Sequence, residues 1–440
     1  MRTFFLYRRL VILLWGMMCS AAAARAQPGN PLRRLLRQDT AAAVRTVLQA
    51  PAQHRVQVYY TRVRRDRRGR PHFRTFTFRG RPGEYIYPAS TVKLAAAALT
   101  LEALRLGQRP LGGMKRVPLG GPGRETPLQI DSAFAGQTRV VADSTAPGGR
   151  PTLGHYIRKV LLVSDNDAYN RLYEFLGQQY LNAALQPRTS RRTRLVHRLS
   201  VGDQEPGSRH ANPFTFFVDS AGTEVSQRRP ALVNKDPLPP LRARHQQVGT
   251  GYYQGDTLVR RPFDFGAKNA FPVRDQQHLL KSLLYPAAVP PARRFGLMPD
   301  DYAFLRKYLH LLPRQSQWPR YDSAAYPDNY AKFLLVGGPP AALPPGVRIY
   351  NKIGQAYGFL LDNACIVDTI SGVEFLLAAV VYVNHDEVLN DDHYDYDTLG
   401  FPFLRRLGQL VYAHELTRTS PRRRRHVSAY WHPRYEQARP

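Results

Sequence analysis

The chain has 440 residues, of which 43% are hydrophobic and two are cysteines. This apolar content suffices for one large folded domain or two to three ordinary ones, and it excludes a disordered chain. The formal charge is +30, from 63 Lys and Arg against 33 Asp and Glu. Such a charge favours anionic surroundings, but no zinc-finger or RNP-like spacing accompanies it, so nucleic-acid binding is not expected.

Residues 1–26 have the features of a secretory signal peptide. Basic residues precede an apolar run that starts at Leu10 and is too short to span a bilayer, and Ala24-Arg25-Ala26 offers a cleavage site. Cleavage would leave Cys365 as the only cysteine, so no internal disulfide is expected. We expect a periplasmic or secreted protein with no transmembrane span after signal cleavage.

Hydrophobic periodicity predicts an α+β chain whose main domain covers residues 27–416. The expected elements are a helix at 39–49, strands at 54–63 and 73–78, a helix from Ala89, short strands near 114–117 and 138–141, helices at 153–163, 168–176, 274–284 and 299–312, strands at 347–352, 359–368 and 373–383, and a helix at 399–416. Residues 188–272 are rich in Arg and Pro and are interpreted as an irregular insertion with hairpins. The basic segment 417–440 is expected to be a flexible tail.

The first chemical motif is Ser90-x-x-Lys93, at the start of an Ala- and Leu-rich run without Gly or Pro until Gly107. A helix that begins near Ala89 places Ser90 in its first turn and Lys93 one turn later on the same face. A neutral amine in this position can take the proton of a serine nucleophile. By itself the spacing is more typical of an ordinary amphipathic core helix.

Two further motifs follow in the sequence. In Ser164-Asp165-Asn166, a hydroxyl and an amide between two helices can face a cleft while Asp165 bonds backbone groups and holds the turn; the same residues are also common helix caps. In Lys352-Ile353-Gly354, on the first of the three closing strands, a cation lies beside a glycine that permits close backbone approach. An ordinary strand lysine before a turn would look the same.

Taken together and in this order, the motifs resemble those of the penicillin-recognising serine hydrolases, most closely the class A β-lactamases. The resemblance covers roughly residues 38–416 without the insertion. It implies an α/β sandwich with an antiparallel sheet and an all-α subdomain. Asp165, Ala168 and Asn170 also resemble the family's sequence around its second motif.

The resemblance also implies roles for individual residues. Ser90 would be the acylated nucleophile, Lys93 its proton acceptor or relay, and Ser164 a proton donor to the leaving nitrogen. Asn166 would bond a substrate amide and Lys352 a substrate carboxylate, while Lys352 also helps to keep Lys93 deprotonated. The backbone N–H groups of Ser90 and Gln355 would form the oxyanion hole, with Gly354 beside them.

Two positions depart from the family pattern. Ile353 stands where the family usually has a hydroxyl residue, and it cannot bond a β-lactam carboxylate. The Glu-x-x-Leu-Asn sequence of the deacylating glutamate is missing where expected. Glu205, with Asn212 as a suggested partner, is the best substitute, but a solvated loop acid is the more common explanation of such a residue.

The motifs and the resemblance together predict an exported serine hydrolase that acts through an acyl-serine intermediate. The expected substrate is a small molecule or peptide with an amide bond, either β-lactam-like or derived from the cell wall. A D-alanyl-D-alanine peptidase, an esterase and a non-catalytic wall-binding protein on the same fold remain alternatives. No cofactor and no metal is expected, and the protein is expected to be a monomer.

Overall fold

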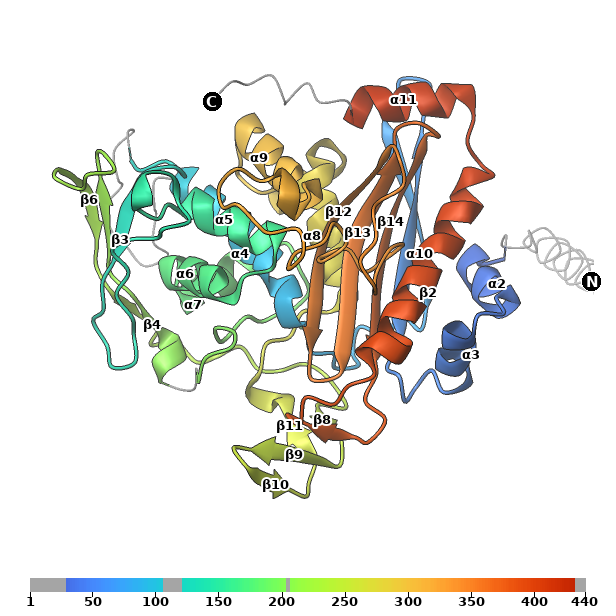
Figure 1. Cartoon of the computed structure of the whole chain (residues 1–440), viewed down its shortest axis with the longest axis horizontal. Helices are drawn as coiled ribbons and strands as arrows, with labels where there is room; N and C mark the ends of the chain where they lie inside the picture. Colours follow the sequence, from blue (N-terminus) through green and yellow to red (C-terminus); the bar gives the residue numbers. More distant parts are fainter. Residues whose placement is uncertain (1–28, 106–120, 203–205, 432–440) are drawn as a thin grey trace, which may run out of the picture.

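The central element is a five-stranded antiparallel sheet with the strand order β12-β13-β14-β1-β2 (Figure 1). The structure is a computed structural model that describes residues 29–105, 121–202 and 206–431. The strands are β1 (Gln57–Arg65), β2 (Pro71–Phe78), β12 (Val347–Ala356), β13 (Phe359–Asp368) and β14 (Val373–Tyr382). β13 and β14 are buried at every position, as expected for strands with a covered surface on both faces.

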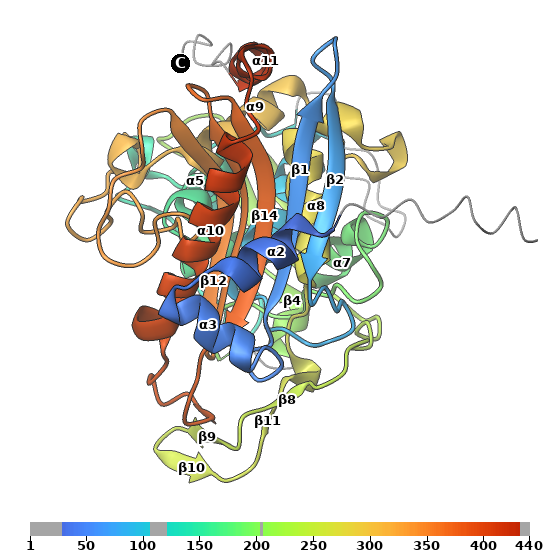
Figure 2. The same cartoon turned by 90° about the vertical axis from the view of Figure 1, so that its right-hand side faces the viewer.

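Three helices cover one face of this sheet (Figure 2). They are α2 (Pro31–Gln38), α3 (Ala42–Gln49) and α10 (Phe401–Leu416). Leu404, Leu407 and Val411 of α10 are fully buried in a cluster that includes Ile353 and Val381. The helix predicted at 39–49 is therefore present as α3, while the preceding α2 was not predicted.

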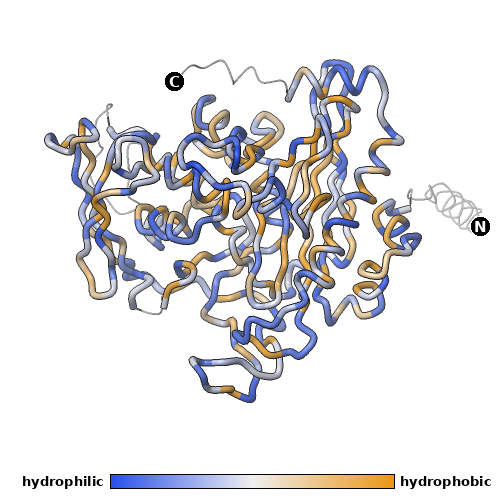
Figure 3. Tube along the Cα trace, viewed as in Figure 1, coloured by the Kyte–Doolittle hydropathy of each residue, from blue (hydrophilic) through white to orange (hydrophobic). Residues whose placement is uncertain are grey.

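Helices pack on the opposite face and continue into an all-α region. They are α4 (Val92–Arg105), α5 (Leu153–Leu162), α6 (Asn166–Leu176), α7 (Gln178–Leu185), α8 (Val273–Leu284) and α9 (Pro299–His310). α4 lies at the centre of their common hydrophobic core, which accounts for its Ala- and Leu-rich sequence. In Figure 3 the hydrophobic colour is concentrated in the strands of the central sheet and in the helices that pack beside it. The predicted α+β fold, with its antiparallel sheet and all-α subdomain, is confirmed.

Small sheets fill most of the segment between α7 and α8, where hairpins were predicted. The pairings are β3 (Leu128–Ile130) with β5 (Phe214–Phe217) and β6 (Val225–Arg229), β4 (His210–Ala211) with β7 (Leu232–Val233), β8 (Gln247–Val248) with β11 (Phe263–Asp264), and β9 (Gly251–Gln254) with β10 (Thr257–Val259) and β15 (Val388–Leu389). The expected strand at 138–141 is reduced to a single bridge between Val140 and Ile130. The strand expected at 114–117 lies outside the described residues, as does the signal peptide.

The prediction of a flexible tail is wrong for residues 421–431, which form α11 (Pro421–Trp431) (Figure 1). Val427 and Trp431 are buried, and the Trp431 indole N–H donates to Glu374 Oε1 over 2.7 Å. Arg423 pairs with buried Glu415 over 2.7 Å. Glu374 lies 57 residues before Trp431, so this buried contact cannot be recognised from the local sequence. No helix in the described part of the chain is long and apolar enough to cross a bilayer.

Candidate active site

Ser90 lies in a 3-10 turn, Ala89–Thr91, immediately before α4. Ala89 has a left-handed backbone (φ 45°), and the Thr91 hydroxyl donates to the carbonyl of Pro88 over 2.7 Å. A non-glycine residue rarely adopts this conformation, and such positions often occur at functional sites. The turn presents half-buried Ser90 to a cavity of about 790 Å³.

The second motif lies in the turn between α5 and α6. Ser164 is left-handed (φ 61°), and the Asp165 carboxylate caps α6 by accepting from the backbone N–H of Ala168 over 2.8 Å. Asp165 thus bonds backbone as predicted, and it does so as the helix cap that the alternative interpretation also expected. Ser164 and Asn166 both line the same cavity as Ser90.

The Lys93 side chain reaches from α4 to this turn. Its Nζ donates to the backbone carbonyl of Ser164 and to Asn166 Oδ1, the latter over 2.6 Å, and lies 3.3 Å from Ser164 Oγ. Burial lowers the pKa of Lys93 to about 7, against the opposing charge of Asp165. A substantial fraction of Lys93 is therefore neutral at physiological pH, as a proton acceptor must be.

Lys352 approaches the same hydroxyl from β12. Its Nζ donates to Ser164 Oγ over 2.7 Å, and the side chain is buried. Burial and the positive charge of Lys93 hold the pKa of Lys352 well below its usual value. Both amines thus contact Ser164. Because like charges repel, the state in which both amines are protonated is disfavoured.

The remaining residues of β12 have separate placements. A Cβ at Gly354 would lie 2.7 Å from the Pro88 carbonyl oxygen, so glycine is required here for contact with the Ser90 turn. Exposed Gln355 lines the cavity together with Ser90, and Ile353 contributes an apolar patch to the wall. The predicted roles of Gly354 and Gln355 toward a substrate stay predictions.

The cavity wall also contains residues that the sequence analysis did not single out. Asn166 Nδ2 donates to Ser200 Oγ over 2.8 Å, and buried Asn170 accepts from the N–H of Leu199 and donates to its carbonyl, which fixes the Leu199–Ser200 segment. The other lining residues beyond the motifs are mainly aromatic or amide side chains, with one carboxylate among those described: Tyr87, Tyr330, Phe333, Tyr357, Tyr394, Tyr396, Phe401, Asn329, Asn390 and Asp392.

Glu205 lies outside the described residues, so its predicted role as deacylating base stays a prediction. Its suggested partner Asn212 is buried and donates to the backbone carbonyl of Asp131 over 2.8 Å. Asn212 is not among the residues that line the cavity.

A second buried polar group lies behind β12. Lys332 Nζ donates to Asn351 Oδ1 over 2.6 Å, and Asn351 Nδ2 donates to Asp362 Oδ1 over 2.8 Å. Asp362 also accepts from the backbone N–H groups of Phe333 and Leu334. Burial lowers the pKa of Lys332 to about 7 and raises that of Asp362. This network fixes the strand position next to Lys352.

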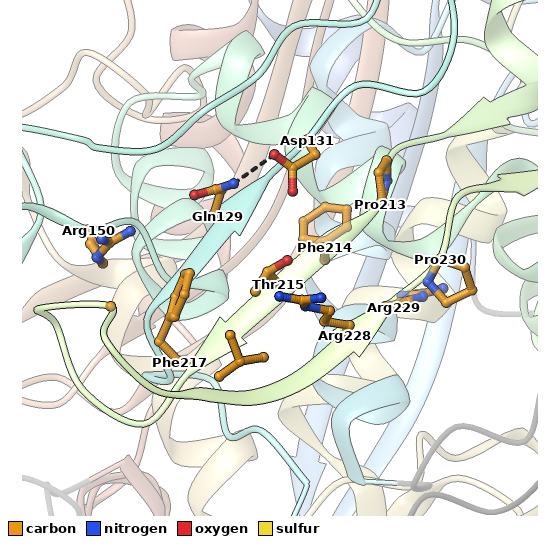
Figure 4. Close-up of a pocket in the computed structure, with 12 residues that line it drawn as sticks. Gln129, Asp131, Arg150, Pro213, Phe214, Thr215, Phe217, Arg228, Arg229 and Pro230 are labelled. Carbon is orange, nitrogen blue, oxygen red and sulfur yellow. Dashed lines mark hydrogen bonds between the residues drawn. The ribbon is translucent and has the colours of Figure 1, made fainter.

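A separate cavity of about 600 Å³ lies on the small β3-β5-β6 sheet (Figure 4). Its charged residues are Asp131, Arg150, Arg228 and Arg229, and it contains none of the three motifs. In the described ranges no cluster of three or more His, Cys, Asp or Glu side chains could hold a metal ion. The cavity that joins all three motifs is therefore the candidate active site.

Part of the chain matches a known protein family. Residues 39–227 match a family described as a β-lactamase enzyme family. Over this segment, the predicted resemblance to a β-lactamase family is confirmed. The β-lactamase-like segment includes Ser90, Lys93, Ser164 and Asn166, whereas Lys352 lies beyond it. No curated protein matches the chain.

Several solved β-lactamase structures are similar to the chain. The enzyme from Sphaerobacter thermophilus is 16% identical, with a TM-score of 0.44 and coverage of 85% of this chain and 96% of that one. The enzyme from Xanthomonas campestris is 16% identical, with a TM-score of 0.43 and coverage of 87% and 96%. The enzyme from Burkholderia phymatum is 16% identical, with a TM-score of 0.42 and coverage of 84% and 96%.

Proposed function

We propose that the protein is an exported serine hydrolase that cleaves an amide or ester through an acyl-serine intermediate on Ser90. The observation that carries this proposal is that Ser90 and Ser164 line one cavity while Lys93 and Lys352, buried behind its wall, both contact Ser164. Burial also lowers the pKa of Lys93 to about 7. Neutral Lys93 accepts the Ser90 proton directly or through Ser164. Ser164, bonded to Lys352, returns a proton to the leaving group.

Covalent labelling tests the acyl-serine step. Intact-mass spectrometry after treatment with a fluorophosphonate or a penicillin should show an adduct on the wild-type protein and none on Ser90→Ala. Absence of an adduct from both reagents would contradict the proposal. It would instead favour a non-catalytic wall-binding protein, for which the +30 charge and Ile353 argue; a peptidoglycan pull-down unchanged in Ser90→Ala would support that alternative.

Deacylation is a separate step that needs a base to activate water. Among the described lining residues there is no carboxylate except Asp392, so Glu205 remains our candidate. Glu205→Gln should acylate normally and then hold the acyl-enzyme, because loss of a general base costs about 10²–10⁴-fold in rate. A nitrocefin burst that stalls in the variant but not in wild type is the expected result. A wild-type protein that itself stalls would resemble a penicillin-binding protein, and a D-alanyl-D-alanine peptidase or esterase activity would then be favoured.

A further inference from the structure

The active-site cavity differs in charge from the rest of this strongly basic protein. No Lys, Arg or His side chain is among its described lining residues, and Asp392 is the one acid there. Lys93 and Lys352 are buried behind the wall, where they bond Ser164. The charge of the cavity lining is therefore opposite in sign to the net charge of the chain, which is +30.

Asp392 is held over the cavity by an ordered loop. β15, which precedes it, pairs in parallel with β9, and the Asn390 side chain donates to the carbonyl of Tyr253 over 3.0 Å. The Asn390 N–H also donates to the Tyr394 hydroxyl over 2.9 Å. Asp392 is exposed and left-handed (φ 61°), and its carboxylate has no hydrogen-bond or ion-pair partner in the described part of the chain.

Two aromatic rings stand beside this carboxylate. The centroids of Tyr394 and Tyr396 are 5.2 Å apart, and the Tyr396 hydroxyl accepts from the Gly358 N–H over 2.9 Å. Burial raises the pKa of Tyr394 to about 12, and the nearby negative charges of Asp391 and Asp392 act in the same direction. Both phenols are therefore neutral at physiological pH. Fixed aromatic faces beside an unpaired carboxylate form a site that recognises an organic cation.

Positive charge lies in an adjoining cavity of about 320 Å³, which shares Tyr87, Leu199, Ser200 and Tyr357 with the main one. Arg198 and Lys268 line this smaller cavity, and Arg198 pairs with Glu174 over 2.8 Å. Neither residue lines the main cavity. On the β12 side, Ile353 offers no donor to a substrate carboxylate.

We propose that the cleft selects substrates that carry an ammonium group, which binds between the Asp392 carboxylate and the Tyr394 and Tyr396 rings. The cleavage of such substrates rests on the proposed hydrolase function, but their binding does not. The inference therefore disfavours substrates whose charged group at this position is a carboxylate. A lysine-like amine on a short alkyl stem has the required chemistry.

Binding to the full-length Ser90→Ala variant tests the proposal without any covalent step. Isothermal calorimetry would compare the methylamides of Nα-acetyl-lysine, Nα-acetyl-norleucine and Nα-acetyl-glutamate. One ion pair and one cation–aromatic contact correspond to roughly tenfold tighter binding of the lysine ligand than of the norleucine ligand. The glutamate ligand should bind most weakly.

Asp392→Asn in the same background should remove the preference for lysine while leaving the norleucine affinity unchanged. Asn is the appropriate replacement because it tolerates the left-handed backbone of this position. Asp397→Asn is the matched control, because Asp397 is exposed nearby and does not line the cavity; it should preserve the preference. Equal affinities for the lysine and norleucine ligands, tighter binding of the glutamate ligand, or a preference that survives Asp392→Asn would each overturn the inference. Fluorophosphonate labelling of Ser90 reports separately on the hydrolase function.

Discussion

Lys352 Nζ donates to Ser164 Oγ over 2.7 Å, so the strand motif and the turn motif are joined by one hydrogen bond. The same oxygen lies 3.3 Å from Lys93 Nζ. Ser164 is thus the only described residue that both amines contact through a side-chain hydroxyl. A proton can pass between α4 and β12 through this single group.

Removal of that hydroxyl should slow acylation. We expect Ser164→Ala to reduce the rate of fluorophosphonate labelling of Ser90 by about 10²-fold, because one proton-transfer group is lost. Ser200→Ala removes only a partner of Asn166 and should cost less than tenfold. Both rates are measured by quenching the labelling reaction at a series of times and determining the labelled fraction by intact-mass spectrometry. Equal rates in wild type and Ser164→Ala would contradict a relay through Ser164.

Acylation should depend on pH through Lys93. Because its pKa is lowered to about 7 by burial, the neutral form that accepts a proton increases as pH rises through 7. The labelling rate should therefore rise about tenfold per pH unit below 7 and level off above about pH 8. A rate that is constant from pH 5 to 9 would exclude Lys93 as the base.

The same buried amine should reduce stability. Lys93 has a pKa of about 7 in the folded protein, against about 10.4 in an unfolded chain. Between these values the unfolded state binds more protons, so wild-type stability rises with pH across this window. Lys93→Met should therefore be more stable than wild type at pH 7, by on the order of 2 kcal/mol after its lost hydrogen bonds, and the difference should shrink toward pH 10. Urea unfolding at several pH values measures this; a variant less stable than wild type at pH 7 would contradict it.

Gly354 should be intolerant of any side chain. A Cβ would lie 2.7 Å from the Pro88 carbonyl and 3.2 Å from the Ala89 Cβ, on the turn that presents Ser90. We expect Gly354→Ala to cost about 1–3 kcal/mol of stability through overpacking and to slow labelling. In the control Gly123→Ala, the nearest atom to the new Cβ is 3.9 Å away. Unfolding curves of the two variants that coincide would show that the turn accommodates the methyl group.

The buried network behind β12 should be required for stability. In Lys332→Met, the carbonyls of Leu309 and Ile349 and the Asn351 amide oxygen lose their shared donor, and Asp362 loses its nearby cation. Leaving buried acceptors without their donor costs about 1–3 kcal/mol. Lys307→Met on exposed α9 surface should cost less than about 0.5 kcal/mol. Denaturant unfolding compares the two, and a neutral Lys332→Met would contradict this role.

Elements with strong periodicity or caps could be predicted from the sequence. The predictions for β13, β14 and α5, with its Thr152 cap, agree closely with the structure, because local sequence determines these elements. β12 begins where predicted but continues to Ala356, beyond the expected end at residue 352. α2 was missed although Asn30 followed by Pro31 is a recognisable helix start, whose amide accepts from Leu32 N–H. α11 was misinterpreted because the acids that pair with it lie on β14 and α10.

The candidate active site likewise contains residues that the local sequence identifies and residues that only long-range packing brings there. Ser90, Lys93, Ser164 and Lys352 were identified because each belongs to a short motif, and the fold then brings them together. Asp392 belongs to an acidic stretch that by itself indicates only an exposed turn, and Lys332 has no local signature. Their positions depend on the loop after β14 and on the segment after α9, whose paths follow from long-range packing.

The strand order has a consequence for biosynthesis. β1 and β2 are made early, but Thr61 of β1 lies opposite Leu376 of β14. A two-stranded hairpin is only marginally stable alone, and pairings between distant segments form slowly. A nascent chain therefore cannot complete its central sheet until residue 382 has left the ribosome. β1 therefore lacks its second neighbouring strand until β14 has been synthesised.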